Sequence, residues 1–271
     1  MPTKRKKTKT NILARILIKK SGDKESRDRQ ILVQWAKTMQ FCRQPYEDPD
    51  THRTHNLKHC KLALCPTCQT RKAKRNRDFL YKQFEEYTRS RRLFETRLDL
   101  PRGNLSGKEL HDAMRMIAYA WKRLTQSADW RKEVRLCAAV IHLPWKSASD
   151  SHPAGYWLHL HIICLTRNKR PDVTRIASEW KTIRNSLGPF NGRSRHDALY
   201  WERVRRLRRT CVYFTHVKKR IAGYPQKKGA PWLLWKIPDN DVVEYVRAVR
   251  YRLRVCYRGF DRDVAKCSKK G

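Results

Sequence analysis

The chain is poor in acidic residues and has no long hydrophobic run. Its 271 residues include only 25 Asp and Glu against 63 Lys and Arg, a formal net charge of +38. Internal ion pairs cannot balance this excess, so an external polyanion is required, and nucleic acid is the first candidate. No segment approaches the ~20 apolar residues that cross a bilayer, and the N-terminus shows no signal-peptide pattern. We therefore expect a cytoplasmic protein without a membrane partner.

We also expect reduced thiols in place of a disulfide framework, because the nine cysteines are an odd number and no export signal precedes them. The stretch "HCKLALCPTC" spaces Cys60, Cys65 and Cys68 as C-x4-C-x2-C. A structural zinc site needs four ligands. Cys42 is the natural fourth ligand, and His52, His55 and His59 are alternatives. The remaining cysteines in apolar contexts are expected to be core residues: Cys137, Cys164, Cys211 and Cys256.

Composition divides the chain into three parts. Residues 1–30 are expected to be a basic mobile tail, 31–75 a Cys/His-rich zinc-binding segment, and 76–271 the main domain. Apolar spacing predicts helices and strands in the main domain, and Ser106 with Glu109 forms a capping box. The helices are expected at 72–92, 104–124, 173–187, 208–223 and 241–254, and the strands at 93–100, 136–143, 157–165 and 198–207. This order predicts an α+β fold, an antiparallel sheet with helices on one face.

Two histidines lie two residues apart in the apolar stretch "WLHLHIICL". In a strand, His159 and His161 point to one face, and Leu160 and Ile162 to the other. The stretch "AAVIHLP" places His142 on the strand expected to pair with them. Three imidazoles can hold a divalent metal that polarises a phosphate oxygen. Hydrogen-bonded core imidazoles and a second zinc site are the alternatives.

These motifs together resemble the HUH endonuclease superfamily, and their order resembles its plasmid rolling-circle replication initiators, the Rep proteins. A cysteine cluster, "CKLALCPTCQTRKAK", is followed by "FETRLDLP" and then by "LHDAMRMIAYAWKRLTQSADWR". The histidine stretch comes next, and "CVYFTHVKK", with a tyrosine, comes last. The resemblance runs from about residue 42 to the C-terminus and implies an HUH endonuclease-like catalytic domain over 76–271.

The resemblance also assigns roles to residues. His159 and His161 match the family's metal-binding pair, Tyr213 its nucleophile, and Lys218 or Lys219 its trailing lysine. The cysteines of the family's cluster correspond to Cys42, Cys60, Cys65 and Cys68. The resemblance implies a catalytic Mn²⁺ or Mg²⁺ and a structural Zn²⁺ as cofactors. The expected strand pairing, and not the family pattern, offers His142 as the third ligand of the catalytic metal.

Two positions depart from the family pattern. The family usually has an acidic residue on the strand before the histidine pair, where this chain has His142, so Glu95 or Asp99 could instead supply the acid. Some members carry a glutamate one turn before the tyrosine, where this chain has Arg209. How the reaction is terminated is therefore open.

The implied activity is nicking and rejoining of single-stranded origin DNA through a 5′-phosphotyrosine, which leaves a 3′-OH to prime replication. The implied partners are single- and double-stranded DNA at a replication origin, a host helicase and a polymerase. Within the superfamily, a single-strand transposase or a relaxase is an alternative. A basic zinc-containing nucleic-acid binder without catalysis is the alternative from another class. Tyr200 and Tyr224 are rival nucleophiles.

Overall fold

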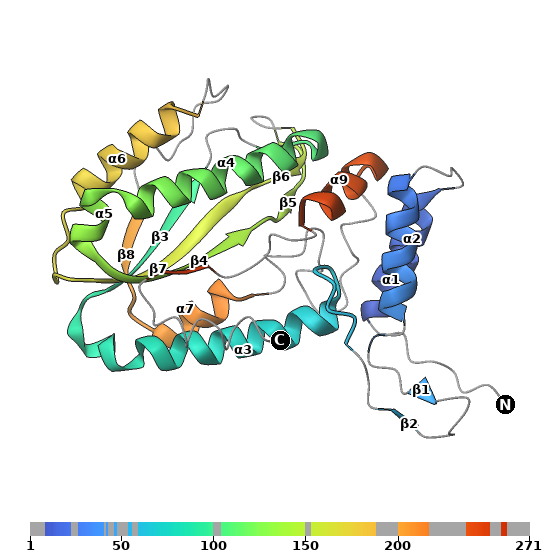
Figure 1. Cartoon of the computed structure of the whole chain (residues 1–271), viewed down its shortest axis with the longest axis horizontal. Coiled ribbons are helices and arrows are strands. Elements are labelled where there is room, and N and C mark those ends of the chain that lie inside the picture. Colours follow the sequence, from blue (N-terminus) through green and yellow to red (C-terminus); the bar gives the residue numbers. More distant parts are fainter. Residues whose placement is uncertain are drawn as a thin grey trace.

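The computed structural model describes residues 9–22, 27–40, 42, 46–47, 54–55, 59–99, 104–149, 153–187, 200–216, 237–249 and 256–258. Within them, an antiparallel sheet lies between two layers of helices (Figure 1). The predicted combination of helices and an antiparallel sheet is confirmed. A small cysteine-rich segment precedes the first strand of this sheet, also as expected.

The main sheet has five strands in the order β8-β3-β7-β4-β9, and every neighbouring pair is antiparallel. The central strand β7 pairs with β3 on one side and β4 on the other. Two short hairpins lie outside this sheet, β1 with β2 and β5 with β6. The strands are β1 (Tyr46–Glu47), β2 (Thr54–His55), β3 (Leu93–Asp99), β4 (Val134–His142), β5 (Trp145–Lys146), β6 (Gly155–Tyr156), β7 (His159–Thr166), β8 (Tyr200–Arg203) and β9 (Cys256–Arg258).

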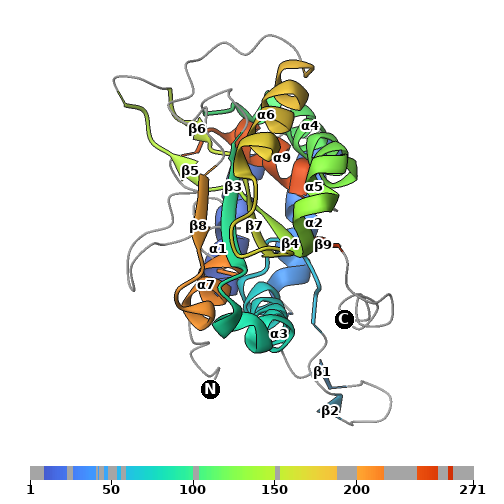
Figure 2. The ribbon, with the colours of Figure 1, turned by 90° about the vertical axis from the view of Figure 1, so that its left-hand side faces the viewer.

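Helices cover both faces of the sheet, so the expectation of helices on one face is wrong. Figure 2, which looks along the sheet, shows α4, α5 and α6 on one side and α3 and α7 on the other. Both faces of the central strand are apolar along most of its length, and each face needs a covering layer. The helices are α1 (Lys9–Ser21), α2 (Arg27–Gln40), α3 (Pro66–Phe84), α4 (Gly107–Gln126), α5 (Ala128–Glu133), α6 (Val173–Asn185), α7 (Leu207–Phe214) and α9 (Asp239–Val249), with a 3-10 turn η1 (Glu85–Ser90).

Two hydrophobic clusters result, one on each face. The larger contains Leu160 and Ile162 of β7 with α4, α6 and α9. The smaller contains Ile163 and Leu165 of β7 with the inner sides of α3 and α7. The alternation predicted for the histidine strand is therefore present, and the face that carries His159 and His161 is the one covered by α3 and α7.

Helix α4 begins with the predicted capping box. The Ser106 backbone N–H donates a hydrogen bond to Glu109 Oε2 at 3.0 Å, which satisfies a donor at the helix start. The next residue, Gly107, lies against α9, where an added Cβ would be 2.6 Å from the Asp241 Cα atom. Its own N–H donates to Asp241 Oδ1 at 2.8 Å. A glycine at this position thus allows the two helices to approach closely.

The expectation of a mobile tail over residues 1–30 is wrong for residues 9–21, which form α1. Leu13, Ile16 and Leu17 are fully buried and belong to the larger cluster together with residues of α2. Lys20 Nζ contacts Asp239 Oδ1 at 2.8 Å and so ties α1 to α9. The apolar stripe of this basic segment explains the result, because it can be buried only when the segment is helical.

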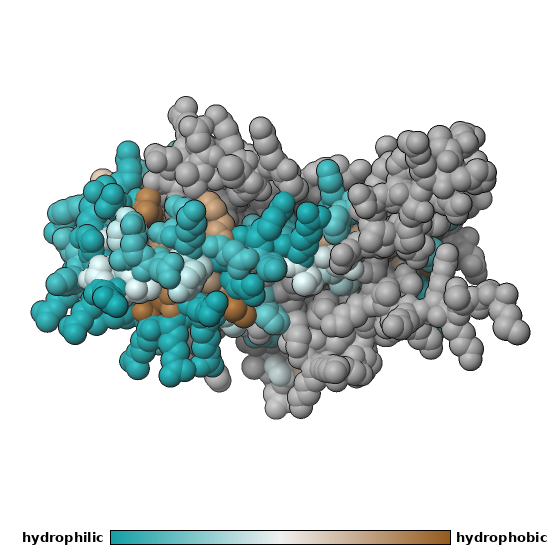
Figure 3. All heavy atoms as spheres, turned by 90° about the horizontal axis from the view of Figure 1, so that it is seen from below, coloured by the Kyte–Doolittle hydropathy of each residue, from teal (hydrophilic) through white to brown (hydrophobic). Residues whose placement is uncertain are grey.

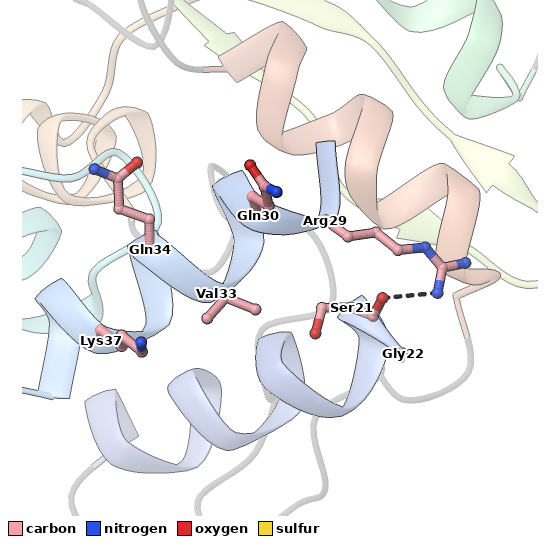
Figure 4. A pocket seen from close by; sticks show the side chains of 7 residues that line it. All are labelled: Ser21, Gly22, Arg29, Gln30, Val33, Gln34 and Lys37. Carbon is pink, nitrogen blue, oxygen red and sulfur yellow. Dashed lines mark hydrogen bonds between the residues drawn. The ribbon is translucent and has the colours of Figure 1, made fainter. Parts of the chain in front are cut away.

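A pocket of about 370 Å³ lies between α1 and α2 (Figure 4). Arg29, one of its lining residues, donates a hydrogen bond from Nη1 to the Ser21 carbonyl oxygen at 2.7 Å. None of the residues that line this pocket is a histidine. Among the described residues, no helix is both long and apolar enough to cross a membrane.

Candidate active site and metal centres

Four cysteines meet where α2 ends and α3 begins. Cys42 follows α2, Cys60 and Cys65 lie in the loop before α3, and Cys68 is in its first turn. The sulfur of Cys68 is 3.5 Å from that of Cys42 and 3.7 Å from that of Cys60. Cys65 Sγ is 3.5 Å from Cys42 Sγ. Cys42 is therefore the fourth member of the cluster, and His59 contacts it from outside, with Nδ1 3.6 Å from Cys68 Sγ.

This cluster fits zinc. A tetrahedral site with Zn–S bonds of about 2.3 Å has S···S separations of about 3.8 Å, close to those observed, whereas a disulfide bond is about 2.05 Å long. Hydrogen bonds from Cys60 and Cys65 lower the pKa of the Cys68 thiol. The hydrogen bond with Cys65 raises the pKa of Cys60. Four cysteines at this spacing can form a zinc site that joins α2 to α3.

Three further cysteines of the described residues are separate from this site. Cys137, Cys164 and Cys211 are buried in the hydrophobic clusters, as expected for core residues. The side chain of Cys256 lies outside the described part of the chain.

Three histidines form a second cluster at one end of β4 and β7. In the antiparallel register, His142 is opposite His159, and Val140 is opposite His161. Opposed residues share a face of the sheet, so the three imidazoles gather on the α7 side. Their ligand atoms lie within 4.8 Å of one another. His142 and His159 are buried, and His161 is partly exposed.

Backbone carbonyls fix the tautomers of two of these rings. His142 Nε2 is 3.0 Å from the Phe214 carbonyl oxygen, and His159 Nδ1 is 3.2 Å from that of Trp157. Since a carbonyl oxygen only accepts hydrogen bonds, both nitrogens must carry a proton. The lone pairs are then on Nδ1 of His142 and Nε2 of His159. Metal-binding histidines are typically oriented by such a bond from the other ring nitrogen.

The donor set suits a divalent metal. Burial lowers the pKa of His159 well below its ordinary value, and His161 and His142 add to the effect. The neutral imidazole favoured in this way is the form that binds metals. Metal–nitrogen bonds of about 2.0–2.1 Å place two ligand nitrogens up to about 4.2 Å apart, so small ring movements would complete the site.

Tyr213 faces the histidine cluster from α7. Its ring centroid is 5.2 Å from that of His161 and 5.7 Å from that of His142. Tyr213 as a residue remains 41% exposed, so a ligand can approach it from solvent. The next residue supplies the Phe214 carbonyl oxygen that binds His142. One hydrogen bond therefore fixes both a ring of the cluster and the end of the helix that carries Tyr213.

Two charged residues of β3 act on this tyrosine. Burial raises the pKa of the Tyr213 phenol, the Glu95 carboxylate raises it further, and Arg97 lowers it. Burial also raises the pKa of Glu95 itself, with Glu202 adding to the rise and the Thr210 side chain opposing it. The site thus contains a carboxyl group and a guanidinium beside the phenol.

The structure separates the remaining residues that the sequence singled out from the histidine cluster, or does not describe them. Asp99 Oδ2 accepts a hydrogen bond from Arg97 Nε at 2.8 Å, and neither Asp99 nor Glu95 belongs to the histidine cluster. Arg209 is exposed on α7. The helix expected at 208–223 is observed as α7, which ends at Phe214, and His216 follows it. The backbone of Tyr200 is paired with that of Arg97 in β8, and Lys218, Lys219 and Tyr224 lie outside the described residues.

Sequence reasoning did not identify Arg97 and Trp157 as members of the site. Arg97 is opposite His161 in the register of β3 and β7, and the Trp157 ring centroid is 4.1 Å from that of His159. The alternation in "FETRLDL" contained a signal, because Glu95, Arg97 and Asp99 are charged at every second position. The pattern alone does not identify the strand that pairs with this one, so it does not place these side chains beside the histidines.

Basic side chains are exposed on the same side of the molecule as Tyr213. In Figure 3, seen from the α3 side, the coloured part of the surface is mostly hydrophilic, with small apolar patches. Lysines and arginines along α3, η1 and α7 account for much of this character. The exposed ones are Arg71, Lys74, Arg75, Lys82, Arg89, Arg208 and Arg209. Such a surface suits the phosphate backbone of a nucleic acid.

The sheet thus carries a three-histidine cluster that could hold a metal ion, a tyrosine that faces it and a basic surface nearby. In a comparison with known families, residues 51–170 match the model of a family described as "Replication protein". The resemblance found in the sequence is thereby confirmed over this region, and it is consistent with a plasmid rolling-circle replication initiator. The match contains the three histidines and three of the clustered cysteines, while Cys42 and Tyr213 lie outside it. No curated protein and no solved structure matched the chain.

Proposed function

We propose that this protein nicks and rejoins single-stranded DNA at a plasmid replication origin, with Tyr213 as nucleophile and His142, His159 and His161 as ligands of a divalent metal. The observation that carries the proposal is the position of Tyr213, whose ring lies 5.2 Å from His161 across the space between α7 and the sheet. Packing alone does not explain a partly exposed phenol beside three imidazoles.

The chemistry is a transesterification. The Tyr213 Oη atom attacks phosphorus, its bond to phosphorus forms, and the bond from phosphorus to the 3′ oxygen breaks. The phenolic proton passes to solvent, and the departing 3′ oxygen takes a proton to become a hydroxyl group. Mn²⁺ or Mg²⁺ bound by the imidazoles would supply Lewis-acid stabilisation of charge on the phosphate oxygens.

The covalent intermediate explains how one protein can both open and close a strand. A 5′-phosphotyrosine keeps the phosphodiester energy, so attack by a 3′-hydroxyl restores the DNA without a further energy source. The free 3′-OH left by the first step would prime a polymerase. A host helicase and polymerase are therefore the proposed partners, and the cytoplasm is the proposed location.

The proposed division of the chain has a segment over residues 31–75 that Zn²⁺ would order at Cys42, Cys60, Cys65 and Cys68, and a catalytic domain over residues 76–271. Helix α3 crosses the boundary between them. The auxiliary role proposed for Lys218, near the nucleophile, is supported by the sequence resemblance alone.

A basic zinc-containing nucleic-acid binder without catalysis remains the competing function. It accounts for the charge and the cysteines, but phosphate binding requires Arg and Lys, not three clustered imidazoles beside a tyrosine.

The test uses circular single-stranded DNA with Mn²⁺ or Mg²⁺. We expect linear DNA with a 3′ end that a polymerase can extend and a 5′ end blocked by protein. His161→Ala should bind the DNA nearly as well but leave it circular. DNA that stays circular with the wild-type protein, while binding is tight, would support the non-catalytic binder.

A further inference from the structure

Arg97 occupies a position on β3 that the proposed chemistry has not yet used. It is opposite His161 in the register, and Asp99 is opposite His159. Directly opposed residues of antiparallel strands share a face. The guanidinium therefore lies on the same face as the histidine cluster, on the β3 side, while Tyr213 approaches from α7.

The side chain of Arg97 is held on two sides. Its Nε donates a hydrogen bond to Asp99 Oδ2 at 2.8 Å, and both side chains are largely buried, with 24% and 12% exposed. Its Cζ atom is 5.2 Å from the Trp157 ring centroid. The Nε–H is only one of the five donors of a guanidinium, and the other four are on the two Nη atoms. The ion pair thus orients the group while its fork-shaped end can bind a further acceptor.

Trp157 brings a second cation to the same place. Lys146 Nζ is 3.4 Å from its ring centroid, and the ring itself is 4.1 Å from that of His159. On this face of β3 the guanidinium of Arg97 lies between two acidic residues, Glu95 and Asp99, and Lys146 adds an exposed ammonium group beside Trp157. A largely buried guanidinium, oriented by one carboxylate and close to an exposed ammonium group, suits a phosphate group that approaches from solvent.

We propose that Arg97 is a catalytic residue that binds a non-bridging oxygen of the phosphate attacked by Tyr213, and that Lys146 binds the neighbouring phosphate of the same strand. Asp99 and Trp157 act as positioning residues. The assignment rests on the proposed function for the identity of the scissile phosphate. Guanidinium donors placed in a partly buried site stabilise the charge that builds up on phosphate oxygens during attack.

The test compares Arg97→Ala, Arg97→Lys and a matched control, Arg175→Ala. Arg175 also pairs with an aspartate, with Nε 3.2 Å from Asp172 Oδ2, but it is exposed on α6, on the other face of the sheet. The first measurement is the single-turnover rate of covalent adduct formation on a single-stranded oligonucleotide with Mn²⁺. The Ala variant should be slower by about 10²–10³-fold, the usual effect of losing one donor to a developing charge, and the control should match the wild type.

Chemical rescue separates a catalytic role from a structural one. Guanidinium ion, added far below concentrations that unfold proteins, should restore part of the Arg97→Ala rate and leave the wild type and Arg97→Lys unaffected. A wild-type rate in Arg97→Ala would overturn the proposal. So would a slow rate that guanidinium fails to restore.

A second measurement does not depend on catalysis. In a Tyr213→Phe background, Arg97→Ala and Lys146→Ala should each weaken oligonucleotide binding relative to Arg175→Ala, and unchanged affinity would overturn the phosphate contacts. If the wild type forms no adduct but the binding losses occur, the nicking function fails while phosphate binding at Arg97 stands.

Discussion

His142 combines two functions that substitutions can separate. The side chain is fully buried; its Nε2 donates to the Phe214 carbonyl oxygen at 3.0 Å, and its Nδ1 is left as the lone-pair atom. His142→Ala removes the ring, the hydrogen bond and the proposed metal ligand together. An unsatisfied buried carbonyl costs about 1–3 kcal/mol, and truncation of a buried side chain adds a cavity cost. We expect a loss of about 3–5 kcal/mol in the free energy of unfolding.

The substitution His142→Gln separates the hydrogen bond to Phe214 from the proposed role as a metal ligand. The glutamine amide can place an N–H near the position of the histidine Nε2 and keep the bond to Phe214, but it cannot offer the imidazole lone pair. It should cost about 1.5 kcal/mol or less in stability, as swaps of similar volume do. Adduct formation should nevertheless fall at least about 100-fold, since even changes around a metal ligand cost 10–100-fold.

Thermal unfolding and adduct assays on both variants check these values. In a protein of this size each kcal/mol lowers Tm by about 2–4 °C, so His142→Ala should unfold at least about 6 °C below the wild type. Equal Tm values for the two variants would refute the hydrogen-bond argument. A fully active His142→Gln would refute the ligand role and move it to Glu95 or Asp99.

Three further predictions concern the zinc centre, the carboxyl group and the charge. The wild type should contain about one tightly bound zinc, and Cys65→Ser with Cys68→Ser should remove it and lower Tm, because zinc binding contributes folding energy directly; elemental analysis showing no zinc in the wild type would refute this. Burial raises the pKa of Glu95 in the folded protein, so the contribution of this group to stability is complete below its pKa in the unfolded chain and is lost as pH rises through its pKa in the folded protein. Glu95→Gln should therefore have the Tm of the wild type near pH 4 and a higher Tm at pH 7. An equal or lower Tm at pH 7 would contradict this. Single-stranded DNA affinity should fall steeply with salt even after deletion of residues 1–8, since the exposed cations on α3 and α7 remain; a slope that disappears with the deletion would place binding in the terminal segment.

Local spacing was sufficient to predict both candidate metal centres. The C-x2-C spacing acts over one turn, and the two-residue period of a strand places His159 and His161 on one face whatever lies around them. The pairing of His142 with His159 also followed, because the two strands are consecutive in this sheet and antiparallel.

Contacts between distant segments were not predictable in the same way. Arg97 joins the site because β3 pairs with β7, and no local pattern in "FETRLDL" specifies that partner. The bond from His142 to Phe214 uses a backbone oxygen, which has no sequence signature. Helix α1 was misjudged because its lysines and arginines dominate its composition, whereas its folding depends on the buried stripe of Leu13, Ile16 and Leu17.

The identity of the adducted residue tests the central claim most directly. The wild-type protein and Tyr213→Phe would each be incubated with single-stranded DNA and Mn²⁺, denatured, digested with protease and nuclease, and analysed by mass spectrometry. The account predicts a nucleotide joined through a 5′-phosphodiester to Tyr213 in the wild type and no adduct in the variant, which should still fold and bind DNA. An adduct on Tyr200 or Tyr224, or one that persists in Tyr213→Phe, would contradict it.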